Sequence, residues 1–456
     1  GVQTCALPIY RIAIYRESAL TVRGIFSTVL RMMISLEGKA WRLAMNVDAT
    51  EVTLEDKRRR VRWKLDERTR FVASNLVRFG TTTTFGEATA DKFQTLGAGK
   101  ATKVSATEIR CEFRTATLRW VMEEDRLRVI AVTGKEANAL ALPGTFRPER
   151  GGFLSAVPSC QGILHTGKGP AFYKPFSSKG HQEGFTLAMF GQIAERGALV
   201  SVAESDDDAV LHWEKTEAGD VRLMWVQHSS MGKLSYDREV VLFPADANLT
   251  AVCKTYRRYE MEKGRFKSWE EKVEERPALK KLFGAAIVFL GYFQDTECDY
   301  AKSLRRLKQL GIDKAVVYPM WCQTTFDVKK VLGIEMADTR RHAKLAKQLG
   351  YLPGSFIYIL DGLKGTGAAA ERRLMLNCEG KPILFWQIKD TQWYKYSNDE
   401  AYRWTRKFLD RELGDLAMVH FDVLTSTRSF EDYHPEHRTD ARDYRENRRQ
   451  IGRAHV

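Results

Sequence analysis

The sequence contains no C-x-x-C pair and no long apolar run, and these absences exclude several classes of protein. Six cysteines lie within the body of the chain: Cys111, Cys160, Cys253, Cys298, Cys322 and Cys378. Because they are scattered, we expect small buried residues rather than a zinc site, a redox motif or disulfides. No apolar run approaches the roughly 18 residues of a membrane span, so no membrane-spanning segment is expected.

Both ends of the chain resemble translated sequencing-adapter read-through, as found at the ends of fragments assembled from environmental DNA. Residues 1–9 read GVQTCALPI, without an initiator methionine, and residues 451–456 read IGRAHV. We interpret both strings as artefacts and exclude them from the fold prediction. The natural protein is then expected to continue past both ends. A signal peptide could precede this stretch, so the compartment stays open.

The formal net charge of +14 raises the possibility of a nucleic-acid partner. The densest basic run, residues 57–64, alternates so that Val61, Trp63 and Leu65 share one face, which favours a half-exposed strand. Residues 438–449 mix arginines with acids and favour a charged helix face. No helix-turn-helix, zinc-finger or RNA-binding signature accompanies either run. We therefore expect no nucleic-acid partner.

The length of 456 residues predicts two or more domains. Residues 10–250 carry short alternating apolar runs separated by glycine, asparagine and aspartate, which is typical of an antiparallel β-sandwich. Residues 251–282 combine aromatic and charged residues and end near Pro277. We predict that they form a helical linker on the surface between two domains.

Residues 283–450 repeat a β/α pattern. An apolar run over residues 283–293 predicts a strand buried on both faces, and three further strands are predicted near residues 315–318, 356–360 and 416–421. The intervening helices end in Leu-Gly at residues 310–311, 349–350 and 413–414, and a strand follows each pair within a few residues. Glycine supplies the left-handed cap, and repeated βαβ units predict a parallel sheet.

Three acids stand at or just beyond the carboxyl ends of predicted strands: Asp295, Asp361 and Asp422. Such carboxylates converge on one rim of a barrel, which is where barrel enzymes keep their chemistry. A dinucleotide fold is less well supported, because residues 365–370 imitate its glycine motif only loosely and favour a flexible loop. At 168 residues (450 − 283 + 1), against about 250 for a complete barrel, residues 283–450 are expected to form the first half of a (β/α)8 TIM-type barrel.

Two motifs now identify a family. The first predicted strand ends Gly291-Tyr292-Phe293-Gln294-Asp295, and the fourth ends His420-Phe421-Asp422 and leads into residues 431–438, EDYHPEHR. Together with the preceding sandwich, this pattern resembles the α-N-acetylgalactosaminidase-like glycoside hydrolases, family 129 and its uncharacterised relatives, and more distantly family 101. Residues 159–164, SCQGIL, resemble the sandwich domain of the same group.

The resemblance implies a retaining glycosidase with Asp422 as the nucleophile. Its acid/base would be a glutamate on a later strand, beyond Gln450. Glycoside hydrolysis needs two carboxyl groups for the same reason, since the departing oxygen must receive a proton. We therefore expect this stretch alone to be inactive and poorly stable. The expected partner is a carbohydrate, either a glycan or a glycoconjugate, and no cofactor or metal is expected.

Further candidate substrate contacts surround Asp422 in the prediction. Asp295 and Asp361 could bind sugar hydroxyls, and Glu431 and Asp432 could bind hydroxyls or pack. Trp321, Trp386 and Trp393 could stack on a sugar face or belong to the core. His434 is a further candidate for substrate binding. His434 and His437 could also ligate a metal, although loop hydrogen bonding is favoured. A non-catalytic carbohydrate-binding protein and a basic nucleic-acid-binding protein remain the alternative functions.

Overall fold

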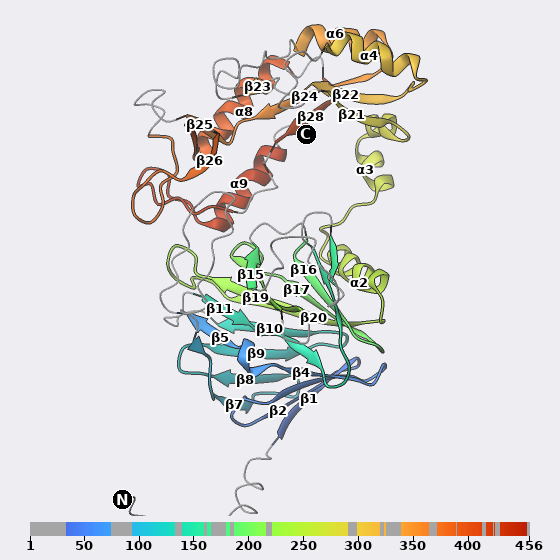
Figure 1. Cartoon of the computed structure of the whole chain (residues 1–456). Coiled ribbons are helices and arrows are strands. Elements are labelled where there is room, and N and C mark those ends of the chain that lie inside the picture. Colours follow the sequence, from blue (N-terminus) through green and yellow to red (C-terminus); the bar gives the residue numbers. More distant parts are fainter. Residues whose placement is uncertain are drawn as a thin grey trace, which may run out of the picture.

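The computed structural model describes residues 33–73, 94–132, 139–158, 162–165, 179–182, 187–215, 221–290, 299–319, 323–324, 339–363, 372–388, 390–412, 416–422, 424 and 429–453. Figure 1 shows antiparallel strands in the lower part of the molecule and helices with parallel strands in the upper part. The segment that carries α2 and α3 leads from one part to the other. The predicted antiparallel β region and the predicted β/α region therefore occur in the expected order along the chain.

Three antiparallel sheets make up the lower part within the described residues. The first has the order β1 (Met33–Glu37), β2 (Trp41–Asn46), β3 (Val52–Asp56), β4 (Val61–Leu65) and β12 (Phe146–Pro148). The second has the order β14 (Ile163–His165), β13 (Leu154–Val157), β16 (Met189–Ile193), β17 (Ala198–Ala203), β20 (Arg238–Ala245), β10 (Leu127–Val132), β9 (Thr117–Met122), β8 (Glu108–Glu112) and β7 (Lys100–Lys103). The third has the order β15 (Lys179–Gln182), β18 (Ala209–Lys215), β19 (Val221–His228), β11 (Ala139–Leu142), β5 (Phe71–Ala73) and β6 (Gln94–Thr95); the 3-10 turn η1 (Glu67–Thr69) precedes β5.

One apolar core joins these sheets, and β4 shows how the sequence builds it. Val61, Trp63 and Leu65 are buried, whereas Arg62 and Lys64 are exposed, so the predicted alternation is confirmed. The same core holds tryptophans from several strands, namely Trp41, Trp63, Trp120, Trp213 and Trp225. Large aromatic rings on inward positions thus supply much of the buried area that holds the sheets together.

The linker contains more structure than the single surface helix predicted. α2 (Leu249–Glu262) and α3 (Trp269–Glu275) are separate helices, and the 3-10 segment η4 (Pro277–Leu282) follows them. α3 buries no side chain, as expected of a surface helix. α2 differs, because Val252 and Tyr259 pack in a cluster with residues of β16, β17 and β20. The prediction of a purely superficial linker is therefore wrong for α2.

Gly191 on β16 is where α2 approaches the sheet. A Cβ atom at this position would lie 2.6 Å from Cγ1 of Val252. We expect Gly191→Ala to lower the free energy of unfolding by about 1–3 kcal/mol, as overpacking does. Adding Val252→Ala should recover part of that loss, because it removes the opposing methyl groups. Urea unfolding of the single and double variants tests this, and strictly additive losses would contradict it.

The upper part contains the predicted parallel sheet. Its strands are β21 (Ala286–Leu290), β22 (Ala315–Pro319), β24 (Leu352–Tyr358) and β28 (Met418–Phe421), with β23 (Gln323–Thr324) beside β24. Each neighbouring pair is parallel. The helices are α4 (Tyr300–Gln309), α6 (Thr339–Gln348), α8 (Asn398–Glu412) and α9 (Ala441–Arg453). The βαβ prediction is thus confirmed for the described strands.

The Leu-Gly stops act as predicted where the structure describes them. Gly311 and Gly350 have φ angles of 79° and 83°, a left-handed conformation that glycine adopts without strain. The Asp299 side chain accepts from the Lys302 amide and caps α4. Residues 413–414 lie outside the described residues, as does the 365–370 loop.

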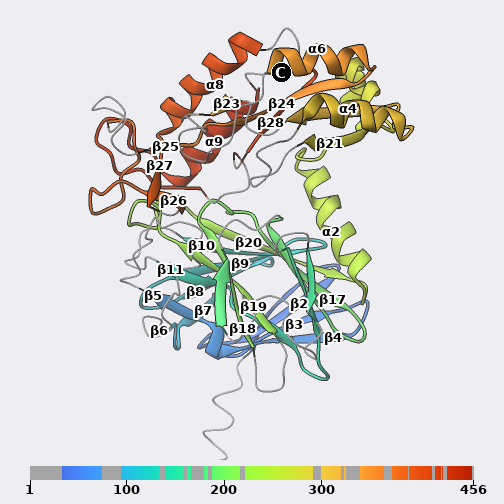
Figure 2. The ribbon, with the colours of Figure 1, turned by 45° about the horizontal axis from the view of Figure 1, so that its top comes forward.

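Helices lie against one face of the parallel sheet (Figure 2). Val317 of β22 and Leu290 of β21 pack with Leu304 of α4 and Ala346 of α6. The opposite face carries Ile287 and Phe289 of β21, which are 68% and 40% exposed. The prediction that the first strand is buried on both faces is therefore wrong. β21 lies at the end of the sheet order, and no closed barrel is present among the described residues.

A small antiparallel sheet, not foreseen from the sequence, lies between β24 and α8. Its order is β25 (Asp361–Leu363), β27 (Thr391–Lys395) and β26 (Leu384–Ile388). Gly362 in β25 has no room for a side chain, because a Cβ atom would collide with the buried Tyr396 ring. The insertion therefore packs tightly on the segment that follows the third parallel strand.

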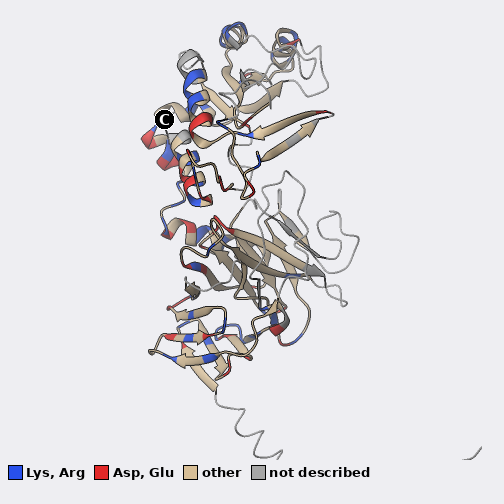
Figure 3. Cartoon of the chain, turned by 90° about the vertical axis from the view of Figure 1, so that its left-hand side faces the viewer, with Lys and Arg blue, Asp and Glu red and all other residues tan. Residues whose placement is uncertain are grey.

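α9 and the loop before it contact the antiparallel part. Arg445 pairs with Asp206 and, at 2.6 Å, with Asp207, and the Arg442 guanidinium lies 4.1 Å from the Tyr236 ring centroid. Burial raises the pKa of Asp207 to about 6, although the Arg445 charge opposes that shift. Charges of both signs line α9 in Figure 3. Arg445 forms ion pairs within the chain, with Asp206 and Asp207. The prediction of a charged helix for residues 438–449 is confirmed over α9.

The described cysteines follow the prediction only in part. Cys111 is buried, but Cys253 and Cys378 are exposed free thiols. The prediction of burial is thus wrong for these two, because Cys253 lies on the outer side of α2 and Cys378 in the turn before Gly380. The remaining cysteines lie outside the described residues. Within the described part of the chain, no helix has the length and apolar character needed to cross a bilayer.

His342 on α6 gives the upper part a predicted acid sensitivity. It is 5% exposed and meets Tyr300 edge to face at 5.5 Å, and burial lowers its pKa to about 4. The unfolded chain, with an ordinary histidine pKa of about 6.5, binds more protons than the folded chain in this interval, so stability falls on acidification. We expect a loss of about 2 kcal/mol between pH 7 and pH 5. Urea unfolding at both pH values should show this loss for the parent chain and not for His342→Phe; equal losses in both would refute the assignment.

Candidate active site

Asp422 directly follows β28, at the carboxyl end of the parallel sheet. Its backbone N–H donates to the Ile357 carbonyl at 2.9 Å, which extends the β24–β28 pairing by one residue. Along β28 the side chains alternate between faces. Val419 and Phe421 pack against the helix-side cluster, so His420 and, by the same alternation, Asp422 belong to the face that the helices leave uncovered. The predicted nucleophile therefore occupies the predicted kind of position.

Aromatic rings from β21, β22, β24 and β28 lie on the same face as Asp422. The ring centroids of Phe289 and Tyr318 are 5.0 Å apart, and those of Phe289 and Phe356 are 5.5 Å apart. The His420 ring lies edge-on to Phe356 at 5.2 Å and to Tyr318 at 5.5 Å. We call these four residues the aromatic floor. Of its rings, Phe289 is 40% exposed whereas Tyr318 and Phe356 are buried, so Phe289 offers the accessible apolar surface on the face that carries Asp422.

The Tyr318–His420 contact orients the floor. The Tyr318 hydroxyl lies 3.1 Å from His420 Nδ1, and burial raises the pKa of Tyr318, so the phenol keeps its proton and can donate. Gly354 on β24 lies close to the base of the Tyr318 side chain, because a Cβ atom there would lie 3.0 Å from Tyr318 Cβ. His420 was noted in the sequence only as part of a motif, and its role in the floor depends on contacts between distant strands.

Asp361, predicted to bind sugar hydroxyls, is fully buried. Its Oδ2 accepts from the Tyr358 hydroxyl at 2.5 Å. Across the β25–β27 pair it stands opposite Lys395, which is also fully buried. The Lys395 Nζ lies 3.4 Å from the Phe385 ring centroid. In this geometry the Asp361 carboxylate is surrounded by protein and exposes no oxygen to solvent. Sugar binding by Asp361 therefore remains a prediction.

Glu431 makes contacts between the two parts of the chain. Its carboxylate accepts from the Met231 amide at 2.7 Å and from the Tyr433 hydroxyl at 3.0 Å. The neighbouring Asp432 is fully buried and accepts from the Leu376 and His434 amides at 3.0 and 2.9 Å. Both acids therefore pack and anchor the loop, which was one of the two predicted roles.

His434 and His437 lie parallel, with ring centroids 4.0 Å apart and an angle of 7° between the rings. His437 Nδ1 lies 2.5 Å from Asp432 Oδ2, and its Nε2 lies 3.0 Å from the Arg372 carbonyl. These contacts match the predicted loop hydrogen bonding. Among the described residues, no group of three His, Cys, Asp or Glu side chains is arranged to hold a metal ion.

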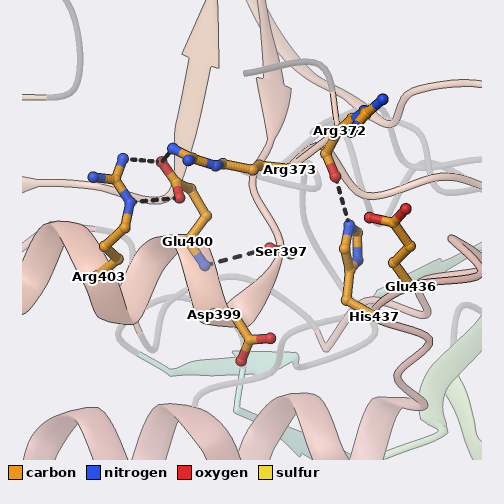
Figure 4. A pocket seen from close by; sticks show the side chains of 8 residues that line it. All are labelled: Arg372, Arg373, Ser397, Asp399, Glu400, Arg403, Glu436 and His437. Carbon is orange, nitrogen blue, oxygen red and sulfur yellow. Dashed lines mark hydrogen bonds and ion pairs between the residues drawn. The ribbon is translucent and has the colours of Figure 1, made fainter. Parts of the chain in front are cut away.

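A pocket of about 620 Å³ lies where α8 begins, on the side of the sheet where the parallel strands end. Figure 4 shows the lining residues Arg372, Arg373, Ser397, Asp399, Glu400, Arg403, Glu436 and His437. Burial opposes ionisation of Glu400, but hydrogen bonds from Arg403 and Arg373 prevail and lower its pKa. At the start of α8, Ser397 and Glu400 form one half of a capping box. The Glu400 amide donates to Ser397 Oγ at 3.3 Å, whereas the Glu400 carboxylate turns to the two arginines.

The other predicted contacts are only partly described. Asp295 and Trp321 lie outside the described residues, as does the Trp386 side chain. Trp393 is fully buried, so it belongs to the core of the insertion and offers no stacking face. The described site thus consists of Asp422 and the aromatic floor, with the α8 pocket at the same end of the strands.

Comparison with known proteins gives no match by sequence. No protein-family model matches the chain, and no curated protein matches it. Solved structures do match: α-N-acetylgalactosaminidase NagBb from Bifidobacterium bifidum in complex with Gal-NHAc-DNJ has a TM-score of 0.75 at 16% identity, covering 92% of this chain and 74% of that chain. The ligand-free form of the same protein has a TM-score of 0.73 at 15% identity, covering 92% and 76%. The chain shares this fold.

This likeness confirms, at the level of fold, the resemblance inferred from the residues around Asp295 and Asp422. At such low identity it carries no residue-level information about the site. The roles of individual side chains therefore depend on the geometry described above.

Proposed function

We propose that this chain belongs to a retaining glycoside hydrolase that acts on α-linked N-acetylgalactosamine or a related sugar, with Asp422 as the nucleophile. The observation that carries the proposal is the position of Asp422. It follows the fourth parallel strand in sequence, on the uncovered face and beside the aromatic floor, in a fold shared with an α-N-acetylgalactosaminidase. Barrel enzymes keep their reactive carboxylates at this end of the strands.

The same proposal covers the architecture. The antiparallel sheets would form a β-sandwich, and the parallel sheet would form part of the wall of a (β/α)8 barrel. Among the described strands, β21, β22, β24 and β28 are neighbours in chain order, and α4, α6 and α8 pack on one face of them, as in a barrel wall. The exposed Ile287 and Phe289 would then face the barrel interior. The domain boundaries proposed from the sequence, 10–250, 251–282 and 283–450, follow this division.

In the proposed first step an Asp422 oxygen attacks the anomeric carbon, and the bond to the aglycone oxygen breaks with its electron pair leaving on that oxygen. An ordinary aglycone needs a proton at this moment. Three described carboxylates of this region are engaged elsewhere, since Asp361 and Asp432 are fully buried and Glu431 binds Met231 and Tyr433. An aglycone that leaves as a stable anion removes the need for this proton.

A dinitrophenyl α-N-acetylgalactosaminide therefore tests the proposal on this chain as it stands. We expect one equivalent of dinitrophenolate to be released in a burst, without sustained turnover. Intact mass spectrometry should show one added N-acetylhexosamine, and peptide mapping should place it on Asp422. Hydrolysis without any adduct, or an adduct on another residue, would contradict the nucleophile assignment.

A non-catalytic carbohydrate-binding protein is the second candidate, and the engagement of Asp361, Glu431 and Asp432 favours it. It predicts saturable N-acetylgalactosamine binding by calorimetry with neither burst nor adduct. Salt-sensitive DNA binding without sugar binding would instead support the nucleic-acid alternative.

A further inference from the structure

A buried hydrogen bond joins Tyr358, the last residue of β24, to Asp361, the first residue of β25. The phenol donates to Asp361 Oδ2 at 2.5 Å. Tyr358 is 4% exposed and Asp361 is fully buried. Two residues close in sequence are thus locked together at the turn that leaves the carboxyl end of the parallel sheet.

The strand register brings Tyr358 next to Asp422. Phe356 pairs with His420 and Ile357 with Phe421, so Tyr358 and Asp422 are the next neighbours along the same two strands. The Asp422 amide bound to the Ile357 carbonyl continues this pairing. By alternation, Tyr358 shares the uncovered face with Phe356, and Asp422 shares it with His420. Adjacent strands lie about 4.8 Å apart, so the Tyr358 side chain leaves the sheet next to that of the candidate nucleophile.

The charge opposite Asp361 suits an ionised carboxylate. Lys395 is its cross-strand neighbour in the β25–β27 pair, and both residues are fully buried. Buried charges persist in proteins when they are paired. An ionised Asp361 is a stronger hydrogen-bond acceptor for the Tyr358 phenol than a neutral group would be.

A phenol has a single O–H, and here Asp361 receives it. We propose that Asp361 is a positioning residue that acts through Tyr358, keeping the phenolic proton away from Asp422 and fixing the ring beside it. This inference rests on the proposed function for its catalytic meaning. A carboxylate that accepts a hydrogen bond from a neighbouring phenol is stabilised as the anion and attacks carbon more slowly. Asp361 would therefore keep Asp422 reactive without contacting the sugar. This positioning role would replace the sugar-binding role that the sequence predicted for Asp361.

The experiment compares two variants that keep the buried charges balanced. Asp361→Leu with Lys395→Met removes the acceptor and its counter-charge together, which frees the Tyr358 proton for Asp422. We expect the maximal rate of adduct formation from the dinitrophenyl glycoside to fall about tenfold, the equivalent of one hydrogen bond. The half-saturating glycoside concentration should stay unchanged. Adding Tyr358→Phe removes the freed proton and should restore the rate to within about threefold of the parent chain.

Tyr396→Phe is the matched control, because Tyr396 is another buried tyrosine of the same region that packs on Gly362. It should leave the rate unchanged. A triple variant as slow as the double variant would overturn the inference, since the loss would then be structural. A double variant as fast as the parent chain would overturn it as well.

A second measurement separates this inference from the proposed function. The ¹³C carboxyl titration of Asp422, assigned by its loss in Asp422→Asn, can be followed without any glycoside. Its midpoint should move to lower pH in the double variant and return in the triple variant. If the parent chain forms no adduct but the midpoint moves in this way, the proposed function fails and the positioning role stands. An unmoved midpoint overturns the positioning role whatever the adduct assay shows.

Discussion

Asp422→Gly should abolish the dinitrophenolate burst and lower the rate of release on the order of 10⁴-fold, the scale seen when a nucleophilic triad loses its supporting carboxylate. The reason is geometric. Asp422 is the carboxylate that ends β28 on the uncovered face of the sheet, and the attack on the anomeric carbon would come from it. Glycine leaves a gap of carboxylate size at that point and no group that can form the ester.

The same gap gives a sharper test than loss of activity alone. Azide is a small anion that can occupy the space of the missing carboxylate and attack the same face of the sugar. Asp422→Gly with azide should therefore release dinitrophenolate again and yield the β-linked glycosyl azide, whose configuration is opposite to that of the α-linked substrate. Nuclear magnetic resonance of the product reads this configuration directly.

Asp390→Gly is the control for this pair of experiments, because Asp390 is an exposed aspartate that precedes β27. It should retain the burst and gain nothing from azide. An α-linked azide product from Asp422→Gly, or a burst that survives the substitution, would remove Asp422 from the reaction.

Asp208→Ala should lower the free energy of unfolding by about 3–5 kcal/mol, the usual cost of breaking a buried ion pair. Asp208 and Arg238 have fully buried side chains and lie 3.1 Å apart. The Tyr236 hydroxyl also donates to Asp208, and the Arg238 guanidinium lies 3.3 Å from the Tyr236 ring centroid. Removing the acid takes a carboxylate charge away from a buried cation, and the Tyr236 and His228 carbonyls that Arg238 also binds are uncharged.

Urea unfolding of the parent chain and of three variants measures this effect. Asp208→Asn should cost less than Asp208→Ala, because the amide oxygen still accepts a hydrogen bond. Glu149→Ala removes an exposed partner of Arg62 and should leave stability unchanged, as surface pairs contribute little. A loss from Asp208→Ala no larger than that of Glu149→Ala would mean that solvent reaches Arg238.

Periodicity predicted the elements that repeat. The alternation of Val61, Trp63 and Leu65 and the Leu-Gly stops at Gly311 and Gly350 report local backbone geometry, which neighbouring residues determine. The sequence also placed Asp422 at a strand end, because the apolar run stops there.

The spacing of apolar residues within a strand could not predict which face of that strand is exposed, because this depends on which other elements pack against it. The run that contains Ile287 and Phe289 is apolar at nearly every position, and such a run predicts burial on both faces whatever packs against it. The burial of Asp361 escaped prediction for a related reason. Its hydrogen-bond donor Tyr358 and its cross-strand neighbour Lys395 come from the preceding strand and from a later hairpin, and the sheet that joins them has no periodic signal in the sequence.

The acids of the loop after β28 bind the main chain more than they bind side chains. Glu431 accepts from the Met231 amide, and Asp432 accepts from the amides of Leu376 and His434. An amide N–H is present whichever residue stands at position 231, 376 or 434, proline excepted. Substitutions can therefore accumulate at those three positions over evolutionary time without breaking the anchors. Anchors of this kind let sequences drift apart while the backbone keeps its path, and identity of only 16% accompanies a TM-score of 0.75 in the comparison with NagBb.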